Sequence, residues 1–174
     1  MLRFNRGDAE ALRDIYALYK DDLVSLAAAL LHDRTTAEDV VHDVFAQLIR
    51  KQERLKITQN LRHYLTTSIA NTARHYFHGQ NKTPALVPDA ELAERIGNGQ
   101  LPESSLLADE QKQQLADALS ALPYEQREVI LLRHLSDFKF KKIASLQNVS
   151  INTVQGRYRY GLDKLRSLLN GELR

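Results

Sequence analysis

Apolar residues recur along much of the chain at intervals of three and four positions, the spacing that places them on one side of an α-helix. Between residues 61 and 77 the spacing is strictly four. The first stripe consists of Leu12, Ile15, Tyr16, Tyr19, Leu23, Leu26 and Leu30. No stretch alternates apolar and polar residues with the period of two that marks a β-strand. The pattern therefore predicts an all-α fold.

Several predicted helices carry start signals. Gly7 and Asp8 supply a start and a cap for the first helix, and Thr36 opens a capping-box-like sequence for the second. Pro123 stands at a first-turn position before the fifth. The predicted helices cover about residues 8–30, 36–49, 61–77, 106–122, 124–135, 139–147 and 151–169.

The middle of the chain interrupts the helical periodicity. Glycines and prolines gather there, at Gly79, Pro84, Pro88, Gly97, Gly99 and Pro102. This composition predicts a flexible linker over residues 79–108, with one short helical turn near residues 90–96. We therefore expect two small helical domains, residues 1–78, a three-helix bundle, and residues 109–174.

Composition excludes several classes of protein. The chain has 174 residues, 43% of them apolar, which is enough to form the core of one ordinary domain or of two small helical domains. It has no cysteine, so disulfides, thiolate metal sites and cysteine nucleophiles are excluded. The longest nearly apolar run, residues 23–31, is far shorter than the ~20 residues of a membrane span, and the first fifteen residues show no signal-peptide pattern. We expect a soluble cytoplasmic protein without membrane insertion.

Charge is distributed unevenly along the chain. The formal net charge is only +2, but residues 112–174 carry 11 basic and 6 acidic side chains, whereas residues 79–111 carry 2 and 6. An acidic middle and a basic end indicate different partners for different parts of the chain.

The most informative segment is residues 139–166, a short helix, a tight turn and a longer helix. The small Ala144 lets two helices cross closely, and Asn148 tolerates a left-handed backbone. Val149 and Val154 fill the angle between the helices. Ser150 is placed to cap the second helix. These features predict a helix-turn-helix.

The second helix of this motif has an apolar and a polar side. Its predicted buried residues are Val154, Tyr158, Leu162, Leu165 and Leu169. The outward residues near its amino end are small or rich in hydrogen-bond donors, as base edges in a major groove require: Asn152, Thr153, Gln155, Gly156, Arg159 and Tyr160. Residues 139–166 contain seven basic side chains and one acidic one, so we expect salt-sensitive binding to duplex DNA.

Two sets of motifs resemble one family. Residues 121–133 (ALPYEQREVILLR), 142–144 (KIA) and 152–166 (NTVQGRYRYGLDKLR) resemble region 4 of extracytoplasmic-function sigma factors. Residues 37–45 (AEDVVHDVF) and 61–74 (LRHYLTTSIANTAR) resemble region 2. The resemblance implies a sigma factor that binds core RNA polymerase and the −10 and −35 promoter elements and catalyses nothing. The resemblance also allows for an anti-sigma factor as a further binding partner.

The resemblance also implies site residues. Residues for docking on core polymerase are Glu38, Asp39 and Asp43, where Asp39 and Asp43 form an unfavourable like-charge pair one helical turn apart. A solvated acidic face near a helix amino end is the other explanation of these three. Residues for the melted −10 strand are Asn60, Arg62, Asn71, Arg74, His75, Tyr76 and His78. His75 and His78 also have the spacing of metal ligands, but no third ligand is identifiable, so no metal site is predicted.

Region 4 supplies the predicted −35 contacts. These are Lys139, Lys141, Asn152, Thr153, Gln155, Gly156, Arg157 and Arg159. The sequence departs from the family here, since Gly156 and Gly161 replace commoner residues inside the recognition helix. Each costs the helix about 1 kcal/mol relative to alanine, which puts its rigidity in question.

Two rival functions remain. One is a helix-turn-helix regulator that binds duplex DNA as a dimer without polymerase, a reading that the acidic residues of the second helix disfavour. The other is an enzyme, but the chain has no nucleophile–base motif, phosphate loop or complete set of metal ligands. We predict no catalytic residue and no cofactor.

Overall fold

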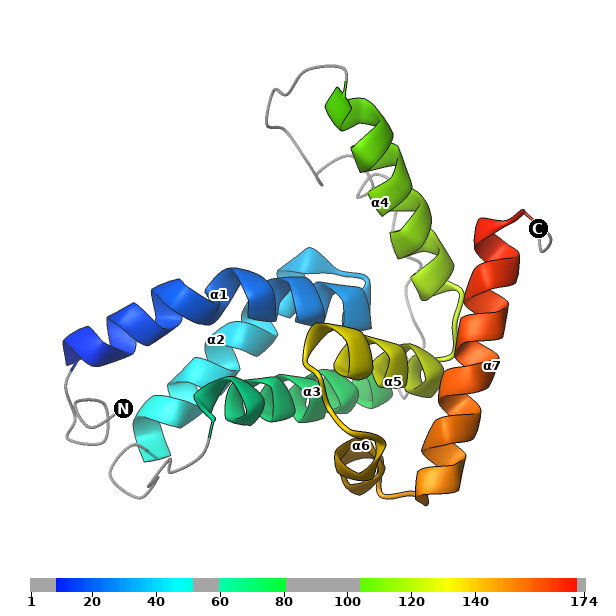
Figure 1. Cartoon of the computed structure of the whole chain (residues 1–174). Helices are drawn as coiled ribbons and strands as arrows, with labels where there is room; N and C mark the ends of the chain where they lie inside the picture. The colour runs from blue at the N-terminus through cyan, green and yellow to red at the C-terminus, as the bar shows by residue number, and fades with distance from the viewer. Residues whose placement is uncertain (1–8, 52–59, 81–103, 172–174) are drawn as a thin grey trace.

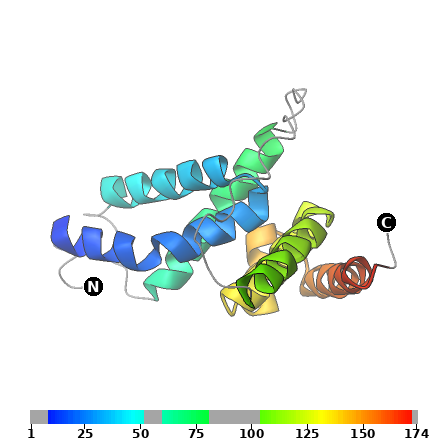
Figure 2. The ribbon, with the colours of Figure 1, turned by 90° about the horizontal axis from the view of Figure 1, so that it is seen from above.

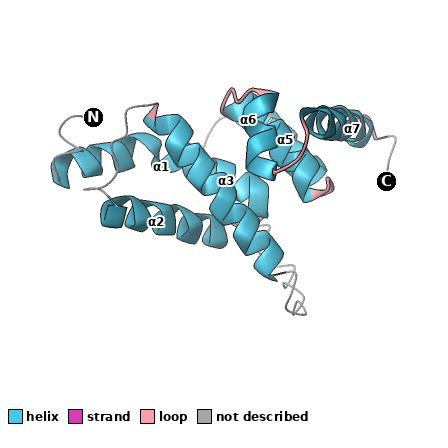
Figure 3. Ribbon diagram, turned by 90° about the horizontal axis from the view of Figure 1, so that it is seen from below, coloured by secondary structure: helices cyan, strands magenta, loops and turns pink. Residues whose placement is uncertain are grey.

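The computed structural model describes residues 9–51, 60–80 and 104–171, and every regular element in these ranges is an α-helix (Figures 1 and 3). The helices are α1 (Ala9–Leu31), α2 (Arg34–Lys51), α3 (Leu61–Gln80), α4 (Ser104–Ser120), α5 (Tyr124–Leu135), α6 (Phe140–Gln147) and α7 (Ile151–Leu169). The predicted all-α class is confirmed. The predicted cap at Gly7 and Asp8 and the predicted turn at residues 90–96 lie outside the described residues.

The start of α2 differs from the prediction. Asp33 caps this helix, because its carboxylate accepts hydrogen bonds from the backbone N–H of Thr35 at 3.0 Å and of Thr36 at 3.3 Å. The Thr36 hydroxyl donates to the same carboxylate. Thr36 therefore lies in the first turn of α2, and the predicted capping box begins three residues too late.

Helices α1, α2 and α3 pack into a bundle, as the four-residue apolar spacing predicts. Leu30 of α1, Val40 of α2 and Leu65 and Ile69 of α3 are all fully buried in its core. In Figure 2, seen from above, α1 and α2 run alongside each other. This arrangement leaves the outer face of α2 and one side of α3 open to solvent.

The carboxy-terminal helices form a second packed group. α5 packs against α7, and α6 packs against α7 as the first helix of the helix-turn-helix. Val129, Leu132, Ile143 and Val154 are fully buried between these three helices. α4 extends away from the group and touches α7 near one end (Figure 1).

The two groups are packed against each other. Leu119, Leu122, Tyr124, Ile130 and Leu131 belong to the same buried cluster as the core of α1–α3. Conversely, Ala70 of α3 is buried in the core of α5–α7. The predicted linker is also helical at both ends, since α3 continues to Gln80 and α4 begins at Ser104.

Candidate nucleic-acid interface

The turn between α6 and α7 has the geometry of a helix-turn-helix. Asn148 is left-handed, with φ 52° and ψ 46°, and its N–H donates to the carbonyl of Ala144. The Ser150 hydroxyl caps α7 by accepting from the Thr153 N–H at 3.0 Å. Val154 is fully buried beneath this turn. The roles predicted for Asn148, Ser150 and Val154 in shaping the motif are confirmed.

The amino end of α7 presents polar side chains to solvent. Asn152, Thr153, Gln155 and Arg159 are exposed, and Gly156 is half-buried. Lys139 and Lys141 on the preceding segment are exposed as well. Tyr160 is 60% exposed, and the Arg159 guanidinium lies 5.2 Å from the centre of its ring. These side chains together form an accessible basic and hydrogen-bonding surface.

The far end of α7 departs from the prediction. Tyr158, Leu162 and Leu165 are half-buried, but Leu169 is 47% exposed. Its predicted burial is wrong, because the last turn of α7 extends beyond the helices that cover the rest of its apolar side.

Gly161 has a packing role that the sequence does not indicate. It is buried where α7 crosses α5, and a Cβ at this position would lie 2.9 Å from Ile130 Cδ1 and 3.2 Å from Gln126 Cβ. A side chain would therefore require Ile130 and Gln126 to shift. At Gly156, by contrast, the nearest atom to an added Cβ is Tyr160 Cε2 at 4.0 Å. The sequence indicated that both glycines make α7 less rigid. For Gly161, the structure shows instead that the glycine permits a close contact between α7 and α5.

The predicted −10 residues do not share one face of α3. Asn71, His75 and His78 are exposed and lie on one side, at the spacing of successive helical turns. Asn60 instead caps α3 by accepting from the Arg62 N–H at 3.0 Å. Arg62 is exposed but contacts Asp22 of α1 at 3.4 Å.

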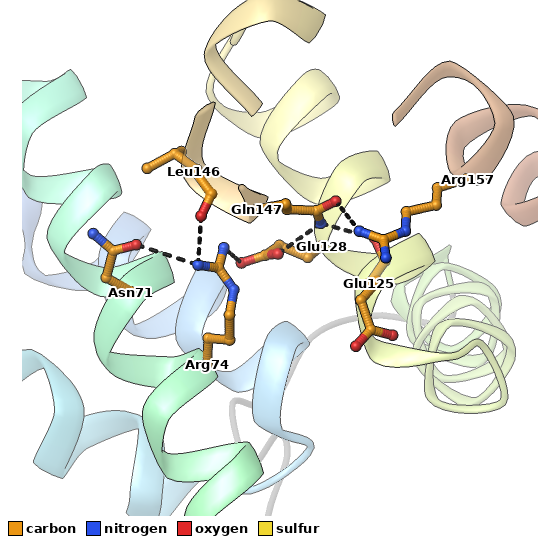
Figure 4. Close-up of polar contacts among 7 residues, drawn as sticks. All are labelled: Asn71, Arg74, Glu125, Glu128, Leu146, Gln147 and Arg157. Carbon is orange, nitrogen blue, oxygen red and sulfur yellow. Dashed lines mark hydrogen bonds and ion pairs between the residues drawn. The ribbon is translucent and has the colours of Figure 1, made fainter. Parts of the chain in front are cut away.

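Arg74 and Arg157 converge on a buried polar cluster (Figure 4). Arg74 Nη2 donates to Glu128 Oε1 at 2.6 Å, and Arg74 Nη1 donates to the Leu146 carbonyl at 2.7 Å. Gln147 Nε2 donates to Glu128 Oε2 at 2.7 Å, while Gln147 Oε1 accepts from Arg157 Nη1 at 2.7 Å. Both arginines, which were predicted to contact DNA, are half-buried and form hydrogen bonds with other residues of this chain.

Glu128 is the anion at the centre of this cluster. Its side chain is fully buried, and burial raises the pKa of its carboxyl above the ordinary value, whereas the charge of Arg74 and the hydrogen bond from Gln147 act to lower it. The Arg74 side chain remains 22% exposed. The short contact with Arg74 and the second hydrogen bond, from Gln147, favour the ionised form of the Glu128 carboxyl.

The sequence does contain a signal for Glu128 that was missed. Tyr124, Glu128, Leu131 and Leu135 are spaced four, three and four apart, so Glu128 interrupts an apolar stripe. A charged residue in such a stripe indicates a buried ionic partner. That partner is Arg74, which lies 54 residues away in the sequence. No local sequence pattern shows that these two residues meet.

The outer face of α2 carries the predicted docking residues. Asp39 and Asp43 are exposed, and Glu38 is half-buried and pairs with Arg34 at 3.3 Å. Tyr76 of α3, predicted to meet the −10 strand, instead donates its hydroxyl to Asp43 at 3.0 Å. That hydrogen bond, with the charges of Asp43 and Asp39, raises the pKa of the Tyr76 hydroxyl. Tyr76 therefore belongs to the acidic surface of α2.

Two further properties concern the described ranges. Within residues 9–51, 60–80 and 104–171, no three histidine or acidic side chains gather as metal ligands would. Over the same ranges, no helix is both long and apolar enough to cross a bilayer.

Comparison with protein families identifies two regions of the chain. The family model described as Sigma-70 region 2 matches residues 15–83, and the model described as Sigma-70, region 4 matches residues 112–165. Together they cover more than half of the chain. The first match includes α2 and α3, and the second includes the helix-turn-helix.

Individual proteins agree with these matches. The RNA polymerase sigma factor CarQ of Myxococcus xanthus is 28% identical over 99% of this chain and 97% of its own length. The ECF RNA polymerase sigma factor SigW of Bacillus subtilis is 25% identical over 94% and 91%. The sigma factor RpoE from Bartonella quintana, solved in complex with the anti-sigma factor NepR, has a similar fold, with a TM-score of 0.67, 22% identity and coverage of 93% and 98%.

These findings place the chain in the sigma-70 family, in its extracytoplasmic-function class. It is an RNA polymerase sigma factor, a subunit that acts in transcription initiation. The rival assignment as a regulator independent of polymerase is not favoured.

Proposed function

We propose that three helices divide the work of promoter recognition. α2 docks on core RNA polymerase, α3 contacts the melted −10 strand, and α7 reads the −35 element in the major groove. The observation that carries this proposal is the order of the two matched regions, in a chain whose second region folds as a helix-turn-helix with an exposed polar helix.

The surface of α7 supports a role in duplex recognition. Asn152, Thr153 and Gln155 are exposed in its first turns, where a recognition helix presents side chains to base edges. Lys139, Lys141 and Arg159 are exposed cations nearby, suited to phosphate contacts. Gly156 leaves the backbone open to close approach of DNA.

The solvent-facing side of α3 supports contact with single-stranded DNA. Asn71, His75 and His78 offer polar groups for unstacked bases. Arg62 is exposed near the amino end of the same helix. Arg74 joins this set only when it leaves Glu128.

Electrostatics supports docking through α2. Asp39 and Asp43 are exposed carboxylates one turn apart, and like charges at that spacing destabilise a helix unless a cation approaches. A basic surface on polymerase is the complementary partner, and long-range attraction would speed the encounter. Glu38 is the weaker contributor because Arg34 already pairs with it.

Charge reversal tests the docking proposal. Asp39→Lys with Asp43→Lys should abolish co-purification with core polymerase while leaving the helical circular dichroism signal unchanged. The matched control is Asp14→Lys with Asp21→Lys, which reverses two exposed acids of α1. Retention of both variants at the wild-type level would refute docking through α2.

The remaining partners follow from the same function. We propose that the chain acts in the cytoplasm, where polymerase works, and that it is a specificity subunit without catalytic activity or cofactor. The similar RpoE chain is bound to an anti-sigma factor, and we propose that a protein of that kind regulates this chain too.

A further inference from the structure

The Arg157 guanidinium of α7 is held by a neutral side chain. Its Nη1 donates to Gln147 Oε1 at 2.7 Å, the single hydrogen bond of this side chain within the described residues. No acidic side chain of the same ranges forms an ion pair with Arg157. Arg74 differs, because the carboxylate of Glu128 already compensates its charge. Arg157 therefore keeps an uncompensated positive charge on a half-buried side chain.

Gln147 can present only its oxygen to Arg157. Its Nε2 donates to Glu128 Oε2 at 2.7 Å and to the backbone carbonyl of Glu125 at 3.1 Å (Figure 4). A flipped amide would place its oxygen against these two acceptors and its NH₂ group against the guanidinium. Every contact would then join groups of the same polarity. The buried Glu128 thus fixes the orientation of Gln147, and Gln147 in turn restrains Arg157.

This series of contacts lies within the carboxy-terminal group of helices. Glu128 is on α5, Gln147 is the last residue of α6, and Arg157 is on α7. The three helices share a core in which Ile143 and Val154 are fully buried. All three contact residues also fall in the region that the model for region 4 matches, residues 112–165. The contacts are therefore part of the packing of the helix-turn-helix.

Arg157 lies at the border between the covered and the open side of α7. Residues three and four positions apart are neighbours on a helix surface. Val154 and Gly161, at these spacings from Arg157, are buried. Thr153 and Tyr160, at the same spacings on the other side, are exposed. A side chain that flanks the exposed side of a recognition helix is placed for the DNA backbone rather than for base edges.

A guanidinium is suited to bridge Gln147 and a phosphate. It has five N–H donors in a planar fork, of which the contact with Gln147 uses one. The other donors can bind a phosphate group, for which the fork is well matched in geometry and charge. A side chain that is already restrained loses less conformational freedom on binding, which strengthens the complex. The contact with Gln147 therefore prepares Arg157 for an anion.

We propose that Gln147 is a positioning residue for DNA binding, which holds Arg157 so that its guanidinium donates to a phosphate of the duplex beside α7. Gln147 acts only through Arg157, and Glu128 orients it. The proposal rests on the function proposed above, in which α7 enters the major groove. It adds to that function a contact that is common to all duplex sequences, because a phosphate carries no base identity.

A double-mutant cycle tests the proposal. Gln147→Met retains a side chain of similar length that can neither accept from Arg157 nor donate to Glu128, and Arg157→Met removes the guanidinium. Binding of the full-length chain to a mixed-sequence B-form duplex would be measured across a salt titration. Arg157→Met should reduce the salt slope by about one unit. Gln147→Met should weaken binding by about 2- to 10-fold, and this loss should disappear in the Arg157→Met background.

Two further variants separate positioning from folding. Gln113→Met removes an amide that donates to Asp117 within α4 at 2.9 Å, and it should leave DNA binding unchanged. Arg157→Lys leaves Gln147 in place and so tests the contact even where Gln147→Met unfolds the protein. It should keep most of the salt slope but bind more weakly, because an ammonium lacks the planar fork. Urea unfolding followed by circular dichroism identifies the variants that remain folded.

The outcomes distinguish this proposal from the wider function. Wild-type affinity in Gln147→Met, or an equal loss with and without the Arg157 guanidinium, would overturn the positioning role. Wild-type affinity in Arg157→Lys would overturn it as well. If Arg157→Met kept the wild-type salt slope while Lys141→Ala reduced it, the positioning role would fail and DNA binding by the helix-turn-helix would stand. A wild-type affinity that did not depend on salt would overturn both.

Discussion

Gly161 shows how one residue sets the distance between two helices. A glycine inside a helix ordinarily lowers stability relative to alanine by about 1 kcal/mol. At this position the close approach of Ile130 and Gln126 opposes that effect, because an added Cβ would require them to shift. Spacing along the sequence could identify Gly161 as a helix residue, but the distance to α5 depends on tertiary packing and has no local signal.

The two glycines of α7 make a matched pair for a stability test. Gly161→Ala should lower the free energy of unfolding by roughly 1–3 kcal/mol through overpacking. Gly156→Ala should raise it by up to about 1 kcal/mol, since its surroundings are open. Urea unfolding followed by circular dichroism measures both. A stability gain in both variants would show that α5 and α7 are not in close contact at Gly161.

Gln155 and Lys141 should affect DNA binding in different ways. Gln155→Ala should change which −35 duplexes are preferred and cost roughly 1–3 kcal/mol on the best site, because it removes a group placed for base edges. Lys141→Ala should weaken all duplexes about equally and reduce the salt slope by about one unit. Salt-titrated binding to −35 and scrambled duplexes distinguishes these effects. Equal weakening of every duplex by both changes would make α7 a phosphate anchor.

At the scale of helices, local signals predicted much of the structure. α5 and α7 begin and end where their apolar spacing, Pro123 and Ser150 placed them. The start of α2 was misplaced because Thr36 and Asp33 are both good caps by residue type. Only the structure shows that Asp33 holds two backbone N–H groups.

The Asp33 cap of α2 can be tested against the cap predicted at Thr36. Asp33→Ala should lower the free energy of unfolding by about 1 kcal/mol, since it leaves the N–H groups of Thr35 and Thr36 without this acceptor. Thr36→Ala removes only a hydroxyl and should lower the free energy of unfolding by a smaller amount. Thermal unfolding of both variants provides the comparison. A larger loss in Thr36→Ala would restore the cap predicted from the sequence.

At the scale of the whole molecule, the packing of the two groups of helices was not predictable. Ala70, Phe77 and Tyr124 look in the sequence like ordinary core residues of their own helices. Nothing local distinguishes a side chain buried within one bundle from one buried between two. The sequence therefore indicated two helical units and their candidate surfaces, but not that Arg74 and Arg157 would form hydrogen bonds with other residues of this chain.

Acid should weaken the folded molecule at the junction of α1 and α5. His32 is an exposed residue, but partial loss of solvent around its imidazole and the nearby charge of Arg127 lower its pKa to about 4 from 6.5. The unfolded chain takes up this proton first, so stability falls as pH drops from about 6.5 towards 4. His32→Asn should reduce that loss, and asparagine suits the left-handed backbone at this position. Urea unfolding at pH 7 and pH 4.5 compares the variants, and an equal loss in both would exclude His32 as the cause.

Transcription in vitro tests the central claim most directly. Purified core RNA polymerase would be incubated with this chain and a library of bacterial promoter fragments, and RNA 5′ ends would be mapped. The account predicts transcripts that start downstream of one shared pair of −35 and −10 sequences, that require the chain, and that are lost with the Asp39→Lys, Asp43→Lys variant. Transcripts that do not depend on the chain, or DNA binding by the chain without any initiation, would contradict it.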